Sequence, residues 1–290
     1  MVSDKDSECH KSDISSWEYW RGTPSHLLKD WVCSYSGYLE DVGRPVRRLE
    51  VPKDCVIMVV GFGDRLHISA VDSSLKSDRY DAFVVGLGTK PLIAEHGGAQ
   101  RCIEIALRPW AIHRLFDGAF SELAQGVVNL EALWGNTTHL LLEQLNEQSS
   151  WQERFRLVDQ ILLENYAASK QTIRPEIQWA WNQLEQYDGC VPIRQLAKTV
   201  GWSDRYFATC FRHHMGITPK VAARLIRFNR AHRRISASGN EALSEIAASC
   251  GYSDQSHFSR EFRQFSGCSP RVYQNAHFSN FLGTPGDIVD

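Results

Sequence analysis

The side chains best suited to chemistry lie on two short segments in the C-terminal half of the chain. Guanidinium, imidazole, amide and hydroxyl groups can hydrogen-bond the edges of DNA bases and the phosphates between them. Such groups recur at helical spacing, and a pair of purely structural helical hairpins would not need them on its surface. The two segments therefore indicate a surface that binds nucleic acid. The first offers Arg205, Thr209, Arg212 and His213, and the second offers Gln255, Ser256, His257, Arg260 and Arg263.

An internal repeat places a tight turn before each segment. One copy, residues 195–204, reads QLAKTVGWSD, and the other, residues 245–254, reads EIAASCGYSD. Both continue with two phenylalanines four residues apart, a spacing that anchors one helix face to a core. The copies are offset by 50 residues up to the Ser-Asp pair and by 51 beyond it, which predicts one extra residue early in the second helix of the second copy. The pattern is that of a helix-turn-helix unit written twice.

The turn residues of the two copies have matching physical roles. Gly201 and Gly251 fall where the first helix ends, a position that often takes positive φ. Ser203 and Ser253 are predicted to cap the second helix, because a serine hydroxyl can accept a hydrogen bond from a free backbone N–H there. We therefore expect helix-turn-helix units at about residues 193–214 and about 243–265.

Charge divides the chain in two. The net charge of the 290 residues is only −2, but residues 1–173 carry 18 Lys and Arg against 24 Asp and Glu. Residues 174–277 carry 14 Lys and Arg, twelve of them Arg, against 8 Asp and Glu. A basic module beside an acidic one is typical of a DNA-binding domain joined to a separate domain, although a solvated basic face would also have this composition.

Residues 174–277 resemble the DNA-binding domain of the AraC/XylS family of bacterial transcription regulators. The Arg-rich stretch between the two units completes the similarity, with arginines at 224, 227, 230, 233 and 234. The matching residues are Ala197 to Gly201, Ala247 to Gly251, Arg227–Ala231, the run GYSDQSHFSR at 251–260, Phe262–Gly267 and Ser269–Tyr273. The first 170 residues, with strands followed by helices, resemble the sensor or oligomerisation domains of the same family, and residues 101–109 and 128–135 are similar to one subgroup of it.

The resemblance implies how DNA would be bound. In that family each second helix enters the major groove, and the linker helix holds the two about one DNA turn, ~34 Å, apart. Ala208 departs from a position that is often polar in relatives, so the first helix is expected to read fewer bases. The implied base-reading residues are Arg205, Thr209, Ser256, His257 and Arg260, and the implied contacts to the DNA backbone are Arg212, His213, Arg224, Arg227 and Arg263. The implied partners are double-stranded DNA, RNA polymerase and a small-molecule effector of unknown identity, with activation as the expected effect.

The N-terminal half predicts strands followed by helices. Stretches rich in Val, Ile and Leu alternate with turn-forming residues, which suggests a small antiparallel barrel or sandwich. The helix expected over Trp151–Tyr166 carries an apolar stripe that either packs on its own domain or pairs two subunits, so a homodimer stays open. The predicted strands are Val46–Val51, Cys55–Gly61, Leu66–Val71, Ala82–Leu87 and Cys102–Leu107, and a further helix is expected over Thr137–Glu147.

The expected fold class is α+β overall. Residues 1–170 would form a strand-rich, barrel-like or sandwich-like sensor domain with flanking helices. Residues 171–277 would form an all-α domain with two helix-turn-helix units joined by a linker helix, and residues 278–290 a C-terminal tail. The N-terminus lacks the apolar core of a signal peptide, and no apolar run reaches the ~18–20 residues of a membrane span, so a cytoplasmic protein without a membrane partner is expected.

Other classes of protein find less support in the sequence. His67, His96 and His113 lie in the strand-rich region and could suggest a metal site, but their spacing matches no known ligand pattern. The eight cysteines include no C-x-x-C pair. Phosphate-binding and nucleophile motifs are absent, so no cofactor and no catalytic residue is predicted. The competing interpretation is a metal-dependent sensor or enzyme domain fused to the same DNA-binding module. A protein that has lost DNA binding is disfavoured, because Arg260 and the linker arginines are present.

Overall fold

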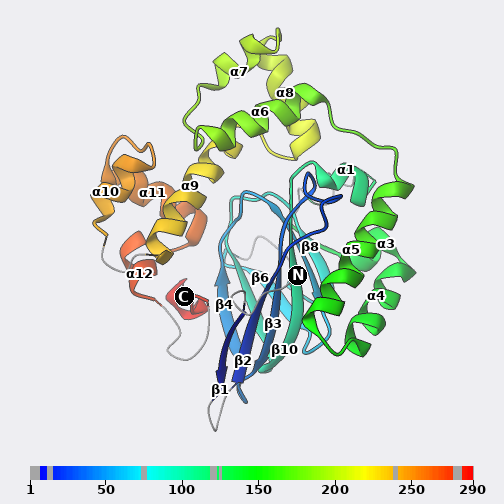
Figure 1. Ribbon diagram of the computed structural model, residues 1–290. Helices are drawn as coiled ribbons and strands as arrows, with labels where there is room; N and C mark the ends of the chain where they lie inside the picture. The colour runs from blue at the N-terminus through cyan, green and yellow to red at the C-terminus, as the bar shows by residue number, and fades with distance from the viewer. Residues whose placement is uncertain are drawn as a thin grey trace.

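The computed structural model describes residues 7–11, 16–72, 77–117, 123, 126–237, 241–276 and 283–289. Of the expected C-terminal tail, residues 278–282 and 290 lie outside the described residues. Strands make up the N-terminal part and helices the C-terminal part, so the α+β class expected from the sequence is confirmed (Figure 1).

Two antiparallel sheets form the N-terminal domain. One has seven strands in the order β1-β2-β3-β10-β5-β8-β11, and the other has four in the order β4-β9-β6-β7. The seven-stranded sheet contains β1 (Ser7–Lys11), β2 (Ser16–Gly22), β3 (Val32–Asp41), β5 (Val56–Gly61), β8 (Ala82–Val85), β10 (Ala99–Leu107) and β11 (Val127–Asn129). The four-stranded sheet contains β4 (Val46–Glu50), β6 (Leu66–Ala70), β7 (Asp78–Tyr80) and β9 (Leu92–His96).

Strand β5 shows why its sequence is apolar throughout. All six of its residues are buried, because both faces of the strand are covered. Val56, Met58 and Val60 belong to the core under the helices, whereas Ile57 and Val59 face the four-stranded sheet. The second of these faces borders a space between the two sheets.

Helices cover the outer face of the larger sheet. They are α1 (Ala111–Leu115), α3 (Leu130–Trp134), α4 (Asn136–Glu147) and α5 (Trp151–Ala168). Trp151 and Phe155 lie directly on the sheet, since a Cβ added at Gly37 would meet the Trp151 ring at 2.5 Å and one at Gly22 would meet the Phe155 ring at 2.7 Å. The apolar stripe of α5 therefore packs on its own domain and is not free to pair two subunits.

The C-terminal domain is helical. Its elements are α6 (Pro175–Gln186), α7 (Ile193–Thr199), α8 (Asp204–Met215), α9 (Pro219–Ala237), α10 (Leu243–Ser249), α11 (Gln255–Ser266) and α12 (Pro270–Asn275). Helix α9 runs from the lobe made by α6, α7 and α8 to the lobe made by α10, α11 and α12 (Figure 1). A 3-10 turn, η2 (Gly286–Val289), packs beside β4 near the C-terminus.

Candidate nucleic-acid interface and ligand cavity

The two repeats fold into matching helix-turn-helix units. Helix α7 leads through Gly201 at φ 74° into α8, and α10 leads through Gly251 at φ 76° into α11. Both glycines adopt the left-handed conformation expected from the sequence, which a residue with a Cβ would adopt only with strain. Helices α8 and α11 each span 12 residues and end on a left-handed glycine.

The cap of one of the two second helices differs from the sequence prediction. Ser203 caps α8 as expected, accepting a hydrogen bond from the Tyr206 N–H. In the second unit the cap is Asp254, whose carboxylate accepts from the His257 N–H at 2.7 Å, and the predicted cap Ser253 lies one position outside. The extra residue therefore lies in the turn, not in the helix as expected, because a carboxylate caps as well as a hydroxyl and the helix starts one residue later.

Buried aromatic rings fix the orientation of both second helices. Phe207 and Phe211 of α8, and Phe258 and Phe262 of α11, have no solvent exposure. The Phe211 ring stacks on Trp181 of α6 at 6.2 Å between centroids. In the second unit, Phe262 lies 5.3 Å from Phe228 of α9 and 5.5 Å from Tyr273 of α12. The opposite face of each helix is therefore directed to solvent.

That outer face carries arginines without carboxylate partners. Arg205 and Arg212 of α8 are exposed, as are Arg260 and Arg263 of α11. Among the residues that the structure describes, no acidic side chain lies within ion-pair distance of any of the four. Guanidinium groups without a carboxylate partner keep their terminal N–H donors available for phosphates and base edges.

The remaining predicted base readers are held more closely by the protein. The Thr209 hydroxyl donates to the Arg205 carbonyl at 3.0 Å, and the Arg260 Nε donates to the Ser256 carbonyl at 3.3 Å. His257 is half-buried, with its Nδ1 3.1 Å from the Ser253 hydroxyl. Ser256 is exposed beside it on the first turn of α11.

Tyr206 is a further exposed residue of α8 that was not among the predicted base readers. It is the third residue of α8, as His257 is the third residue of α11, and it is 45% exposed. The signal was in the sequence, but it is found only when the repeats are aligned with an offset of 51 from the cap onward. An exposed phenol at this position can donate to a base or a phosphate.

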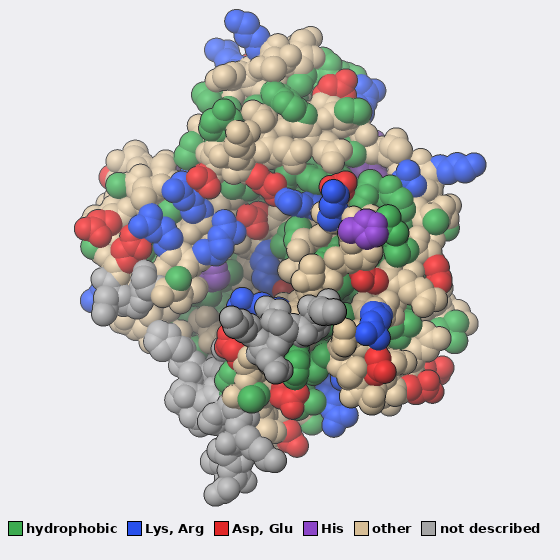
Figure 2. All heavy atoms as spheres, in the orientation of Figure 1, with side chains coloured by type: hydrophobic (Ala, Val, Ile, Leu, Met, Phe, Trp, Pro, Cys, Tyr) green, Lys and Arg blue, Asp and Glu red, His purple; other side chains and the backbone are tan. Residues whose placement is uncertain are grey.

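The linker helix uses its arginines inside the protein. Arg224 donates to the Glu261 carboxylate at 2.6 Å, and Arg227 lies 3.9 Å from the same group. Arg230 pairs with Asp188 at 2.7 Å, Arg233 with Asp54 at 3.6 Å, and Arg234 with Glu241. Figure 2 shows Lys and Arg side chains gathered over α9 and α11, with acidic side chains close beside them. The two α9 residues predicted to contact phosphate are thus placed on a buried carboxylate, unlike Arg212, His213 and Arg263, which are exposed.

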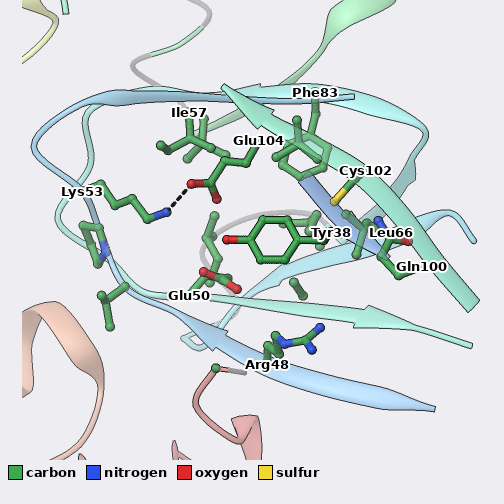
Figure 3. A pocket seen from close by; sticks show the side chains of 18 of the residues that line it. Tyr38, Arg48, Glu50, Lys53, Ile57, Leu66, Phe83, Gln100, Cys102 and Glu104 are labelled. Carbon is green, nitrogen blue, oxygen red and sulfur yellow. Dashed lines mark hydrogen bonds and ion pairs between the residues drawn. The ribbon is translucent and has the colours of Figure 1, made fainter. Parts of the chain in front are cut away.

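A cavity of about 460 Å³ lies between the two sheets of the N-terminal domain (Figure 3). Its apolar walls come from both sheets and include Ile57, Leu66 and Phe83. At one end the Lys53 ammonium donates to the Glu104 carboxylate at 2.8 Å. Five tryptophans of the N-terminal domain, at 17, 20, 31, 110 and 134, are not among the residues that line it.

The three histidines considered as metal ligands do not come together. His67 pairs with Glu95 at 2.8 Å, His96 lies 3.3 Å from Glu40, and His113 contacts His214 of the C-terminal domain. Within the described part of the chain, no group of three His, Cys, Asp or Glu side chains could hold a metal ion. The described helices also include none that is long and apolar enough to cross a membrane.

The loop between β4 and β5 belongs to both the cavity and the linker helix. Pro52 and Lys53 line the cavity. The Pro52 carbonyl accepts a hydrogen bond from the buried Asn229 amide of α9 at 3.1 Å, and Asp54 pairs with Arg233 of the same helix. A shift of this loop would therefore act directly on α9.

The C-terminal tail makes a second connection. The Thr284 carbonyl accepts from the Leu49 N–H of β4 at 2.9 Å, and the Thr284 hydroxyl lies 3.0 Å from the Tyr273 hydroxyl of α12. Gly283 lines the cavity, and Val289 packs against Gly267, the glycine that ends α11. Residues 283–289 thus link the cavity wall to the end of the second recognition helix.

A histidine pair joins α1 to the end of α8. The His113 Nε2 lies 3.3 Å from both the His214 Nδ1 and the His214 carbonyl. Burial lowers the pKa of His113 to about 4, with His214 and His213 acting in the same direction. A separated His113 would titrate near 6.5, so the docked form excludes a proton that the separated form binds.

Docking between the two domains is therefore expected to weaken as the pH falls from about 6.5 towards 4. Limited proteolysis of the connection between α5 and α6, run at pH 7.5 and pH 5, measures this. The His113→Phe variant removes one of the two histidines of this contact and should lose part of the pH dependence. Burial also lowers the pKa of His214, which stays in the variant. The pKa of His232 is also lowered to about 4, first by burial, so a smaller residual effect is expected in both proteins. Identical pH profiles for the two proteins would contradict the prediction.

The paired units and their exposed helix faces define the C-terminal region as a helix-turn-helix domain. Residues 196–276 match the family described as helix-turn-helix domain. This region is a helix-turn-helix domain of the AraC type, which confirms the resemblance of residues 174–277.

Curated relatives match over this region. The chain is 34% identical over 94 residues to the probable transcriptional regulator LumQ of Photobacterium leiognathi, covering 32% of this chain and 38% of that one. It is 33% identical over 92 residues to the raffinose operon regulatory protein RafR of Pediococcus pentosaceus, covering 32% and 33%. The transcriptional activator RhaS of Pectobacterium carotovorum is 34% identical over 68 residues, covering 23% and 24%. The matches thus span only about a third of the length of these relatives, or less.

Among solved structures, ToxT of Vibrio cholerae is similar over 83% of this chain and 97% of its own, with 11% identity and a TM-score of 0.47. The AraC-like transcriptional activator CuxR is similar over 80% of this chain and 86% of its own, with 14% identity and a TM-score of 0.35.

Proposed function

We propose that this protein is a sequence-specific DNA-binding transcription regulator that responds to a small molecule. The observation that carries the proposal is the contrast between two sets of arginines. Those on α9 are ion-paired with carboxylates of the protein, whereas Arg205, Arg212, Arg260 and Arg263 on the outer faces of α8 and α11 have no such partner in the described chain. Unpaired arginines on two matching helices suit two successive major grooves.

Roles within the interface follow from position on each helix. Arg205, Thr209, Ser256, His257 and Arg260 lie in the first half of their helices and would read bases, with Tyr206 added to this set. Arg212, His213 and Arg263 lie in the last turns and would hold phosphates. Arg224 and Arg227 could reach DNA only by leaving Glu261, so a contact of these two residues with the DNA backbone is less well supported.

The cavity in the N-terminal domain is proposed as the effector site. Two segments that line the cavity support this proposal. The loop at Pro52 and Lys53 contacts α9 through the Pro52 carbonyl, and the tail lines the cavity at Gly283 and contacts α12 through the next residue, Thr284. Activation, with RNA polymerase as partner, is proposed because RhaS is named an activator. In such a protein, ligand binding would act on α9 and so change the relative positions of the two helix-turn-helix units.

Selection of DNA from a random pool with the full chain, followed by a salt titration, tests DNA binding. If the unpaired cations contact about three to five phosphates, log K should fall with log [salt] with a slope of about −3 to −5. The Arg212→Gln variant should make the slope shallower by about 1, whereas Arg230→Gln, which removes an arginine already paired with Asp188, should not change it. A slope near zero, or failure to enrich any sequence, would refute the proposed function.

A further inference from the structure

The apolar walls of the cavity favour a ligand with an apolar body. Ile57 and Val59 of β5 face Leu66 and Ile68 of β6 across the space, and Phe83 of β8 closes one side. A volume of about 460 Å³ is in the range that takes a small organic molecule. Removal of an apolar body from water would supply most of the affinity.

Three polar groups in the cavity lack protein partners. The Gln100 residue is 3% exposed, and neither the nitrogen nor the oxygen of its amide has a hydrogen-bond partner among the described residues. Its near neighbour is the Cys102 thiol, a weak hydrogen-bonding group. The Tyr38 hydroxyl and the Glu50 carboxylate also make no hydrogen bond or ion pair with another described residue. The Gln100 amide is buried, whereas Tyr38 and Glu50 are half-buried in the cavity wall. Polar groups that are shielded from water and left unpaired cost free energy, so these three mark where a ligand would be recognised.

Figure 3 shows how these groups are arranged. The Tyr38 hydroxyl points towards the end of the cavity where Glu50, Lys53 and Glu104 lie, and Gln100 lies at the other end with Cys102. The polar groups therefore form a charged end and an uncharged end, with the apolar walls between them.

The charged end is short of one cation. Glu104 pairs with Lys53 at 2.8 Å and Glu40 pairs with Arg48, so among the described residues the Glu50 carboxylate has no ion-pair partner of its own. Burial raises the pKa of Glu50; Lys53 and Arg48, each paired with another carboxylate, oppose this shift, whereas Glu104 and Glu40 add to it. The cost of the unpaired charge would disappear if a ligand brought a positive group to it.

The other charged residues of the cavity do not supply this cation. Lys90 is paired with Asp72 at 2.7 Å, and Glu8 and Arg21 are exposed at the mouth. His96 lies against Glu40, 3.3 Å from its carboxylate. A carboxylate ligand would have to compete with Glu104 for Lys53 while facing Glu50, and an uncharged alcohol would leave Glu50 unpaired.

We propose that the effector is a small organic amine, a monocation whose ammonium group binds Glu50 and the Tyr38 hydroxyl and whose apolar body extends towards Gln100. This inference rests on the proposed function only in calling the ligand an effector. It assigns the chemical class of the ligand, which the fold and the comparisons leave open.

A matched series of probes tests the charge preference. The full chain is titrated in a calorimeter with 4-phenylbutylamine, 4-phenylbutanol and 4-phenylbutyrate, which share one apolar body and differ in the charge of the head group. We expect the amine to bind at least about tenfold more tightly than the other two. The Glu50→Gln variant should bring the amine to within about threefold of the alcohol. The control Glu8→Gln, which removes an exposed carboxylate at the mouth, should keep the preference.

Tyr38→Phe gives a second test, because it removes only the hydroxyl and should weaken the amine several-fold while leaving the alcohol and the thermal melting temperature unchanged. Tightest binding of the butyrate, no binding of any probe, or an amine preference that survives in Glu50→Gln would each overturn the proposal.

DNA binding by the same preparation is measured without any probe. If DNA is bound and no probe is, the ligand class is wrong and the regulator function stands. If the amine binds as expected and DNA does not, the regulator function fails and the ligand class stands.

Discussion

Replacement of Glu261 by alanine is expected to lower the free energy of unfolding of the C-terminal helices by about 3 kcal/mol. The Glu261 side chain is 5% exposed and lies between Arg224 and Arg227, whose side chains are 23% and 20% exposed. Without the carboxylate, two largely buried guanidinium groups would face each other with no counter-charge. Because Arg224 and Arg227 belong to α9 and Glu261 to α11, the loss would loosen the packing of the second unit on the linker helix.

Urea unfolding, followed at the transition that reports on the C-terminal helices, measures this change. Glu245→Ala is the matched control, since Glu245 is an exposed acid on α10 and its loss should change the free energy by less than about 0.5 kcal/mol. Arg224→Gln adds a test of the predicted contact between Arg224 and the phosphates of the DNA backbone. A stability loss with an unchanged salt slope would mean that Arg224 holds Glu261 and not phosphate. If Glu261→Ala behaved like Glu245→Ala, the charged cluster would not be what holds α11 on α9.

The helix-turn-helix units could be predicted closely because their signals are local. A positive-φ glycine, a capping side chain and two phenylalanines one helical turn apart each act within a few residues, so a repeat of these features predicts a repeat of the fold. The one error, the cap of α11, arose where two adjacent residues, Ser253 and Asp254, can both cap. Only the backbone decides which of them takes the extended conformation.

The sheet domain was predicted less completely. The five predicted strands correspond to β4, β5, β6, β8 and to the last six residues of β10, where Val, Ile or Leu recur between turn-forming residues. Strand β3 was missed because its sequence, VCSYSGYLED, alternates small, aromatic and acidic residues. Its burial comes from α5, which lies more than a hundred residues later and packs Trp151 onto Gly37. Such long-range partners override local preference.

The use of the linker arginines could not be seen in the sequence either. Arg224, Arg230 and Arg233 are equally basic on paper, but their partners Glu261, Asp188 and Asp54 come from three distant segments. The same pairing has a functional consequence, since Arg233 and Asn229 bind the loop that lines the cavity. The linker helix is thus held by the N-terminal domain on one side and by α11 on the other, so under the proposed function a ligand signal would pass through it.

Base reading and phosphate binding are expected to separate at Arg260 and Arg263. Both are exposed on α11 and unpaired in the described chain, so their loss changes the net charge equally. Arg260 shares a face with Ser256 near the start of the helix, opposite the buried Phe258 and Phe262, which is the part of a recognition helix that faces base edges. Since a bidentate contact to guanine gives about 1–3 kcal/mol of discrimination, Arg260→Ala should weaken operator binding by about that amount and relax the preference at one base pair.

Arg263→Ala, in the last turn, should weaken binding to every sequence about equally and make the salt slope shallower by about 1. Binding of both variants to a panel of single-base operator variants measures the difference. If Arg260→Ala lowered the affinity for every operator by the same factor, Arg260 would hold phosphate, and base reading by α11 would rest on Ser256 and His257.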